Sequence, residues 1–240
     1  MRLFALVALL LCPIRGKHDV GVLDVPSALL LGIDISHHQR RIDWQRLVEN
    51  SELHFVFVKA TEGGDFVDTL FAENWAILRQ MGIRRGAYHY FRPNRDGVLQ
   101  AQHFLKATHF EPGDLAPVLD LETTDGLHPD IVRREALEWL DYVERTLHIR
   151  PIVYTNLNFY ERHLAGYFED YPLWIARYAE GLPQLRTHRW HFWQFTEKGR
   201  LPGIPRPVDL NVFRGTPSML ERLCWYPKGE KPSLASLKAP

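Results

Sequence analysis

The sequence predicts an α/β protein, an irregular (β/α) TIM-like barrel with eight strands and about five helices. Eight short apolar runs, rich in Val, Ile, Phe, Tyr and Trp, recur along the 240 residues with turn residues between them. Helical patterns lie between the early runs, and strand–helix alternation is typical of parallel sheets. Polar residues end several runs, at the position where barrels of this kind carry their active sites.

The apolar runs define the expected strands. In order they are Leu31–Ser36, Phe55–Gly63, Arg85–Phe91, Ala116–Glu122, Pro151–Asn156, Leu173–Tyr178, His191–Thr196 and Val208–Phe213. The eighth run ends the predicted barrel domain, residues 30–215. An open, doubly wound sheet is the alternative arrangement, but no G-x-G-x-x-G follows the first run, so a dinucleotide site is not expected.

Helical patterns follow only the first five strands. Residues 68–82 and 133–147 each place apolar side chains on one side at helical spacing; Gly82 is a suitable C-terminal stop for the first, and Pro129 suits the first turn of the second. Shorter patterns cover Trp44–Asn50, Val98–Thr108 and Leu157–Leu164. The links Ala179–Trp190 and Glu197–Pro207 are rich in Gly and Pro and are predicted as loops. The barrel is therefore expected to lack helices in its last part.

The composition of the chain argues against several classes of function and of stabilising feature. With 29 basic and 29 acidic residues the formal net charge is +0, which argues against an electrostatic grip on nucleic acid or anionic lipid. The twelve histidines show no convincing metal-ligand spacing, so neither a metal nor another cofactor is expected. Cys12 and Cys224 are not expected to pair if the N-terminal segment is removed, which leaves stability to the hydrophobic core. The chain is expected to act as a monomer.

The termini carry two further expectations. Residues 1–16 resemble a signal peptide, because Arg2 precedes an apolar run, Leu3–Leu11, that is too short to span a membrane. No small-x-small triplet marks a cleavage site, so an uncleaved anchor is the alternative. The protein is accordingly expected to be secreted or periplasmic, without a stable membrane span. Residues 226–240 are polar and proline-bearing and are predicted to form a flexible tail.

Carboxylates and aromatic residues gather at the downstream ends of the predicted strands. Asp34 ends the first, Lys59 and Glu62 the second, Tyr88, His89 and Tyr90 the third, Asp120 and Glu122 the fourth, and Tyr154 and Asn156 the fifth, while Trp174, Gln194 and Asp209 belong to the last three. Each also has a structural interpretation. Glu62 suits a solvated loop, Trp174 suits the core, and Tyr88 with Tyr90 suits a buried hydroxyl network.

A structural role is least convincing for Asp120, which lies between Leu119 and Leu121 in a buried run. Burying such a carboxylate costs several kcal/mol unless it is paired or hydrogen-bonded. Strand alternation places Asp120 and Glu122 on one face, with Cα atoms about 6.5 to 7 Å apart. Because like charges repel, one of the two should hold a proton at neutral pH. Glycoside hydrolysis needs a protonated and an ionised carboxyl, although D-x-E at a strand end also occurs in metal sites.

Eight blocks of the chain together resemble glycoside hydrolase family 25, the lysozymes also called N-acetylmuramidases. In order they are "GIDISHHQRRIDW", "FVFVKATEG", "RGAYHYFRP", "APVLDLE", "PIVYTN", "LWIARY", "FWQFTEKGRLPGI" and "VDLNVF". The resemblance implies an irregular barrel and hydrolysis of the β-1,4 bond between N-acetylmuramic acid and N-acetylglucosamine in the glycan strands of peptidoglycan. It implies Glu122 as general acid, and Asp120 as the residue that orients the substrate's 2-acetamido group for attack with retention. Asp34 and Asp209 would tune these two, and Tyr88, Tyr90, Tyr154, Trp174 and Gln194 would line the groove.

Two other functions remain open from the sequence. A non-catalytic barrel that binds peptidoglycan or chitin would keep such a groove, but the presence of Glu122 with the three aspartates argues against it. An enzyme acting on another N-acetylated polymer such as chitin would use the same acetamido chemistry. Residue spacing does not choose between retaining and inverting hydrolysis, because the expected carboxyl separation falls between the two ranges.

Overall fold

The chain forms strands at all eight predicted positions. The computed structural model describes residues 29–185 and 189–230. Its strands are β1 (Leu29–Ile35), β2 (Phe55–Glu62), β3 (Phe66–Val67), β4 (Arg85–Tyr90), β5 (Val118–Asp120), β6 (Ile152–Asn156), β7 (Leu173–Ala176), β8 (Trp190–Gly199) and β9 (Val208–Arg214). The two-residue strand β3, which pairs only with β2, has no counterpart in the sequence prediction.

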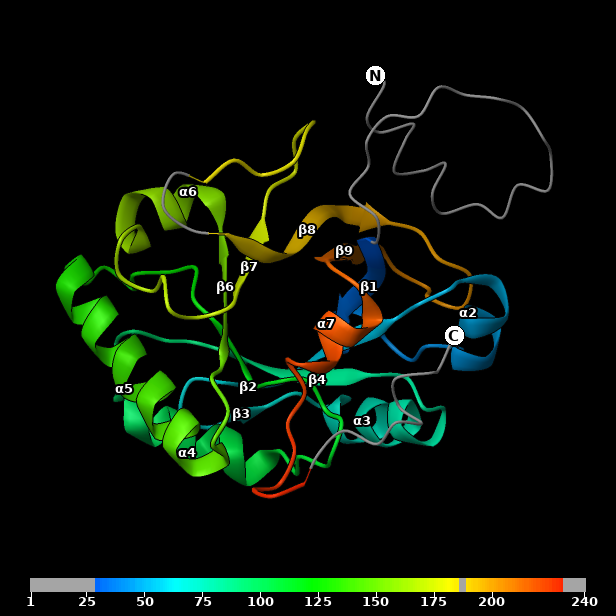
Figure 1. Cartoon of the computed structure of the whole chain (residues 1–240), viewed down its shortest axis with the longest axis horizontal. Coiled ribbons are helices and arrows are strands. Elements are labelled where there is room, and N and C mark those ends of the chain that lie inside the picture. The colour runs from blue at the N-terminus through cyan, green and yellow to red at the C-terminus, as the bar shows by residue number, and fades with distance from the viewer. Residues whose placement is uncertain (1–28, 186–188, 231–240) are drawn as a thin grey trace.

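The predicted barrel is confirmed, with one strand reversed. The strands are ordered β1-β9-β8-β7-β6-β5-β4-β2, and pairing of β1 with β2 closes the sheet, which rules out the open alternative (Figure 1). Neighbours from β1 through β2 and β4 to β8 are parallel, whereas β9 is antiparallel to both β8 and β1. The first residues of β9 therefore lie at the rim formed by the last residues of the other strands.

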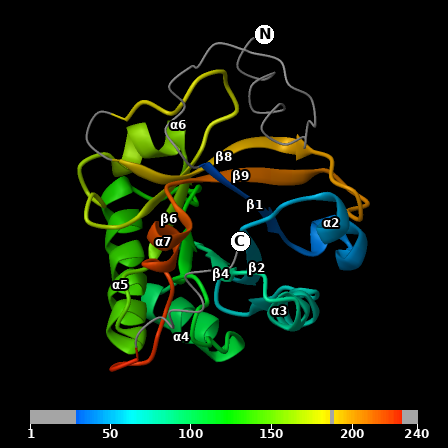
Figure 2. The ribbon, with the colours of Figure 1, turned by 45° about the vertical axis from the view of Figure 1, so that its right-hand side comes forward.

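Helices follow the first five predicted strands, as expected. They are α2 (Trp44–Asn50), α3 (Phe71–Gln80), α4 (Gly97–Ala107), α5 (Pro129–Leu147) and α6 (Leu157–Phe159), with a 3-10 turn, η1 (His37–Gln39), before α2 and a π-helical turn, η2 (Tyr160–Leu164), after α6. The side chains of Asp43, Asp96 and Asn156 accept hydrogen bonds from first-turn N–H groups of α2, α4 and α6. In Figure 2, α3, α4 and α5 lie outside one wall of the barrel, and β8 and β9 form the opposite wall.

The last two barrel strands form a long hairpin, which corrects the predicted loops. Trp190 and residues 197–199, expected in loops, belong to β8, and Gly199 pairs with Val208. A Cβ atom on Gly199 would lie 2.5 Å from the carbonyl oxygen of Val208, so glycine permits the close approach of the two backbones. Pairing with β9 thus satisfies backbone groups that the Gly- and Pro-rich sequence suggested would face solvent.

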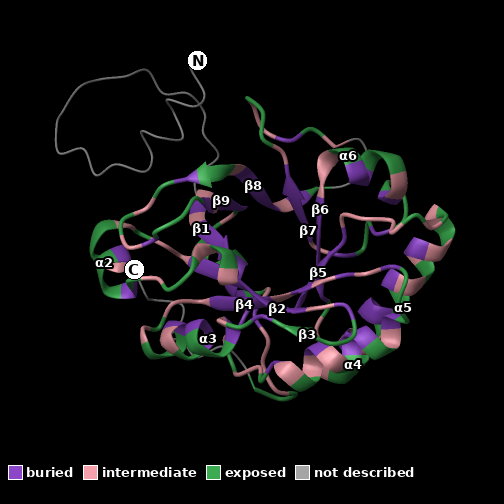
Figure 3. Ribbon diagram, turned by 180° about the vertical axis from the view of Figure 1, so that it is seen from behind, coloured by how far each residue is buried: buried purple, intermediate pink, exposed green. Residues whose placement is uncertain are grey.

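Buried residues, purple in Figure 3, are concentrated in the barrel strands. Apolar side chains form two clusters, one inside the barrel and one between the strands and the helices. Inside the barrel, the rings of Phe57 and Trp174 stack with centroids 4.5 Å apart, and Phe192 contacts Phe57 edge-on. Glycine makes room for one of these rings, because a Cβ on Gly86 would lie 2.6 Å from Phe57. The interior is therefore a packed core, and chemistry is restricted to its rims.

The chain continues past residue 215 and packs against the barrel. A short helix, α7 (Pro217–Glu221), precedes a bridge between Cys224 and Leu115. Glu221 forms an ion pair with Arg84 and accepts a hydrogen bond from the Tyr226 hydroxyl. Because Arg84 and Leu115 precede β4 and β5, this segment covers the end of the barrel where the parallel strands begin.

Some expectations fall outside the described residues. The predicted signal peptide, Cys12 and residues 231–240 of the predicted tail belong to this group. Cys224 is buried with a free thiol. Within residues 29–185 and 189–230, no helix is both long enough and apolar enough to cross a membrane.

Candidate active site

Four carboxyl groups meet at the rim where the parallel strands end. Asp34 is the next-to-last residue of β1, Asp120 ends β5, and Glu122 follows two positions later. Asp209, the second residue of β9, pairs directly with Asp34 in the antiparallel register. The reversed direction of β9 therefore brings an early residue of that strand to the same rim. The charge of Asp34 raises the pKa of both Asp120 and Glu122, and that of Glu122 raises the pKa of Asp209.

Asp34 is a buried carboxylate held by amide donors. Its Oδ2 atom accepts hydrogen bonds from Asn211 Nδ2 at 2.7 Å and from Gln194 Nε2 at 2.8 Å. Burial raises the pKa of Asp34, and the hydrogen bonds from Asn211, Gln194 and Asp209 act in the opposite direction. Donors fixed on one carboxylate favour its ionised form, so Asp34 is the charged member of the Asp34–Asp209 pair.

Asp209 is the protonated member of that pair. Burial, and then the charge of Asp34, raise the pKa of Asp209 to about 9. The group therefore keeps its proton at neutral pH and donates it in a hydrogen bond to Asp34. Sharing one proton in this way lets two carboxyl groups occupy neighbouring positions without full repulsion.

Asp120 lies deepest on its side of the rim and retains an unused acceptor. The residue is 6% exposed, and its Oδ1 atom is buried without a hydrogen-bond partner among the described residues. Burial and the charge of Glu122 raise the pKa of Asp120 well above its usual range, while the ammonium group of Lys59 lowers it. A buried acceptor without a donor is costly in the free protein. A ligand with an N–H group bound at this rim would supply the hydrogen bond that Asp120 Oδ1 lacks.

Glu122 is half-buried and is tied to the neighbouring strand. Burial, and then the charge of Asp34, raise the pKa of Glu122, whereas a hydrogen bond from the Asn156 side chain lowers it. Asn156 ends β6, and its Oδ1 atom accepts a hydrogen bond from Phe159 N–H at 2.9 Å, capping α6. One asparagine thus fixes both the start of a helix and the orientation of Glu122.

The five residues expected to line a groove divide into two groups. Tyr88 and Tyr90, on β4, are half-buried. Burial and the charges of Asp34, Asp120 and Asp209 raise the pKa of Tyr88 well above its usual range, which places its hydroxyl near the carboxyl groups. Lys59 Nζ lies 4.9 Å from the ring centroid of Tyr90. These two tyrosines have surface left for a ligand.

Tyr154, Trp174 and Gln194 instead support Asp34 from inside the barrel. Trp174 is 2% exposed, and its Nε1 donates to Asn211 Oδ1 at 2.8 Å, the same asparagine that donates to Asp34. The Tyr154 hydroxyl donates to Gln194 Oε1 at 3.0 Å. Trp174 is therefore buried and hydrogen-bonded in this structure, and its contact with a substrate stays a prediction.

Four further residues join the site: Lys59 and Asn156, which the sequence places at strand ends without assigning them a role, and Tyr178 and Asn211, which it does not single out. Asn211 lies two positions after Asp209, so strand alternation alone indicates that it shares a face with Asp209. The Tyr178 hydroxyl donates to Gln194 Oε1 at 2.5 Å. No group of three or more His, Cys, Asp or Glu side chains in the described part of the chain is arranged to hold a metal ion.

Comparison with known proteins adds an independent observation. The model of "Glycosyl hydrolases family 25" matches residues 33–204, which include Asp34, Asp120 and Glu122 and end before Asp209. The chain is 43% identical over 202 residues to Escherichia coli K12 YegX, an uncharacterized protein, covering 82% of this chain and 74% of that one. It is 30% identical over 205 residues to lysozyme M1 of Streptomyces globisporus, covering 79% of this chain and 69% of that one.

The fold is shared with solved structures as well. A family 25 glycosyl hydrolase from Bacillus anthracis superposes with a TM-score of 0.76 at 28% identity, covering 86% of this chain and 99% of that one. The family match spans most of the barrel, and its matched residues include three of the four carboxyl groups at the rim. The chain therefore belongs to glycosyl hydrolases family 25 and is a glycoside hydrolase.

Proposed function

We propose that this protein is a lysozyme that hydrolyses the β-1,4 bond between N-acetylmuramic acid and N-acetylglucosamine in peptidoglycan. The observation that carries the proposal is the pair formed by Asp120 and Glu122, two carboxyl groups with raised pKa values at the open rim of the barrel. The similarity to lysozyme M1 supports peptidoglycan as the substrate. A secreted or periplasmic location follows from that substrate.

Glu122 serves as the general acid. Its raised pKa favours the protonated form, and its partial exposure lets the side chain reach a glycosidic oxygen. The hydrogen bond from Asn156 holds the carboxyl group in one orientation. Transfer of the proton to the leaving oxygen accompanies cleavage of its bond to the anomeric carbon.

Asp120 orients the substrate. Its unpartnered Oδ1 atom accepts a hydrogen bond from the N–H of the 2-acetamido group, which supplies the missing donor. That hydrogen bond also favours the ionised form of Asp120. The charge of Glu122 raises the pKa of Asp120, and the hydrogen bond from the substrate opposes this effect by favouring ionised Asp120. Substrate binding therefore favours the state in which the proton is on Glu122, where the reaction needs it.

The acetamido oxygen then attacks the anomeric carbon as the leaving group departs, and a cyclic intermediate forms. Water opens this intermediate at the anomeric carbon, and the Glu122 carboxylate accepts the proton that the water loses. Two inversions give net retention. The alternative is direct attack by water with Asp120 as base, which inverts the anomeric centre. Proton NMR of the first product, recorded before mutarotation, separates the two routes.

The decisive experiment identifies the sugar at the new reducing ends after digestion of purified peptidoglycan. N-acetylmuramic acid at those ends supports the proposal, and N-acetylglucosamine contradicts it. Release of ends from chitin at a comparable rate would favour the broader N-acetylated substrate. Glu122→Gln should lower the rate by about 10²- to 10⁴-fold, while Glu138→Gln, on the exposed face of α5, should leave it near wild type. Binding without release of ends by the wild type would favour a non-catalytic barrel.

A further inference from the structure

A pocket opens at the same rim of the barrel as the four carboxyl groups. Its volume is about 440 Å³, and it is lined by His37, His38, Gln39, Arg40, Arg206 and Pro207; we call it the Arg40–Arg206 pocket. One wall continues the chain past Asp34 on β1, and the other precedes Asp209 on β9. Because Asp34 and Asp209 are paired, the pocket lies at the same rim. Its lining residues are at most six positions from Asp34 or Asp209 along the chain, so their Cα atoms lie within about 20 Å of that pair even if the chain is fully extended.

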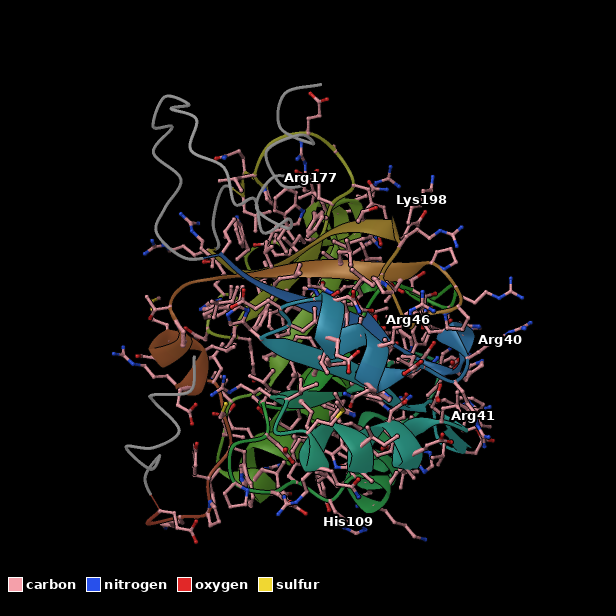
Figure 4. The ribbon with its side chains drawn as sticks, turned by 90° about the vertical axis from the view of Figure 1, so that its right-hand side faces the viewer. Arg40, Arg41, Arg46, His109, Arg177 and Lys198 are labelled. Atoms are coloured by element: carbon pink, nitrogen blue, oxygen red, sulfur yellow. The ribbon has the colours of Figure 1, made fainter. Side chains whose placement is uncertain are left out.

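The lining of the pocket is basic. It contains two arginines and two histidines and no acidic residue. Arg40 and Arg206 are exposed, and neither forms an ion pair with another described residue. Figure 4 shows Arg40, Arg41 and Arg46 on one side of the molecule, although Arg41 lies 3.5 Å from Glu73. The lining of this pocket is therefore basic, although the chain as a whole has a formal net charge of +0.

The walls of the pocket are tied together. Gln39 Nε2 donates to the carbonyl oxygen of Pro207 at 3.0 Å, across the pocket. His37 Nδ1 lies 2.6 Å from the buried carboxylate of Asp68, which fixes the ring and leaves Nε2 available to a ligand. The Asp43 N–H donates to the carbonyl oxygen of Gly203 at 2.9 Å and anchors the β8–β9 loop to α2. Hydrogen bonds therefore join the two segments from which the basic side chains extend.

Arg40 occupies a backbone conformation that suits glycine. Its φ is 61° and its ψ is −164°, a combination found almost exclusively at glycine because of the contacts that Cβ makes. Its N–H donates to the carbonyl oxygen of His37 at 3.0 Å, which holds the turn. A non-glycine residue in such a position costs stability, and unrelieved local strain is concentrated at functional sites. A side chain that is kept at this position at a cost in stability favours a function for the Arg40 guanidinium group.

We propose that the Arg40–Arg206 pocket binds a carboxylate of the peptide carried by N-acetylmuramic acid in peptidoglycan. The inference rests on the proposed function and names which part of the substrate this pocket recognises. The peptide branches from the sugar that contributes the cleaved bond, so it leaves the glycan strand close to the carboxyl groups. A guanidinium group binds a carboxylate through two parallel hydrogen bonds, and two arginines over one pocket offer this fork from both walls.

Binding tests the assignment without hydrolysis. In the Glu122→Gln background, the dissociation constants of two probes are measured by NMR titration: the N-acetylglucosaminyl-N-acetylmuramic acid disaccharide with its tetrapeptide, and the same disaccharide without it. We expect the peptide to tighten binding about tenfold. Arg40→Ala and Arg206→Gln should each reduce this ratio by about threefold to tenfold. Arg145→Gln removes a charge from the exposed face of α5 and should leave the ratio as it is.

Arg40→Gly separates the backbone from the side chain. It should lower the ratio as much as Arg40→Ala does, while only the glycine variant should raise the melting temperature. An equal dissociation constant for both probes, or an unchanged ratio in both Arg40 variants, would overturn the proposal. Failure of the proposed function is distinct: wild-type protein would then release no reducing ends from peptidoglycan even where the ratio responds as expected.

Discussion

Asp34 and Asp209 lie opposite each other on the antiparallel strands β1 and β9 and share one proton. Burial and the charge of Asp34 raise the pKa of Asp209 to about 9. Asn211 and Gln194 hold Asp34 in its charged form from the other side. Holding these two carboxyl groups side by side lowers the free energy of unfolding, and the size of this loss depends on pH.

Replacing Asp209 with Asn should make the protein more stable at neutral and alkaline pH. In the unfolded chain Asp209 titrates near 3.8, and in the folded protein near 9. Between these values the folded state holds a proton that the unfolded state has lost, so the contribution of Asp209 to stability falls as pH rises. Asn stays neutral and still donates to Asp34. We expect a melting temperature about 2–4 °C above wild type at pH 7, equivalent to about 1 kcal/mol.

Thermal denaturation of both proteins from pH 4 to pH 9 checks this expectation. The difference between the two melting temperatures should widen with rising pH over this interval and be smallest near pH 4. A difference that stays constant, or that narrows toward pH 9, would mean that Asp209 does not carry the shared proton.

Asn156→Asp should extend activity to higher pH. Asp at this position still accepts the hydrogen bond from Phe159 N–H and caps α6, but it no longer donates to Glu122 and adds a negative charge nearby. Since the hydrogen bond from Asn156 lowers the pKa of Glu122, its loss raises that pKa, and the acid stays protonated to higher pH. The alkaline limb of the kcat/KM profile should move up. Asn50→Asp, at the end of α2, adds the same charge elsewhere, and its profile should match that of the wild type.

Trp174→Phe should affect stability more than substrate binding. The change removes the indole donor and leaves the buried Asn211 Oδ1 without it, which costs about 1–3 kcal/mol. Trp139→Phe is the matched control, because Trp139 is also fully buried but its Nε1 has no partner among the described residues. Urea denaturation should show the larger loss for Trp174→Phe, with KM for peptidoglycan close to wild type. A large rise in KM at normal stability would contradict this prediction and show that Trp174 contacts the substrate.

Glu221→Gln should destabilise the packing of α7 and the residues after it against the end of the barrel where the parallel strands begin. Glu221 is 3% exposed and binds both Arg84 and Tyr226. Neutralising it leaves the Arg84 guanidinium without its counter-charge, so we expect a loss of about 1–3 kcal/mol. Glu138→Gln, on the exposed face of α5, should stay within about 0.5 kcal/mol of wild type in the same denaturation experiment. Equal stability of the two variants would show that the ion pair contributes nothing to the packing of α7.

Prediction from sequence worked best where the signal is local. Periodicity located α3 and α5, and apolar runs located all eight barrel strands. Carboxylates at strand ends led to Asp34, Asp120 and Glu122 because the cost of burying a charge is visible in the sequence itself. The support of Asp34 by Asn211 and Gln194 could not be predicted in this way, since these contacts join residues 177 and 160 positions apart.

The sequence by itself determined the strand–helix order and the placement of charges at strand ends, because backbone preference and burial cost act over a few residues. Only the tertiary structure decided the direction of β9, which places Asp209 against Asp34. It also decided that Trp174, Tyr154 and Gln194 are buried and joined by hydrogen bonds to Asp34 or to its amide partners. It alone joined Arg40 and Arg206 across one pocket. The physical reason is closure: when β1 pairs with β2, residues distant in sequence become neighbours, and their pKa values and roles follow from those neighbours.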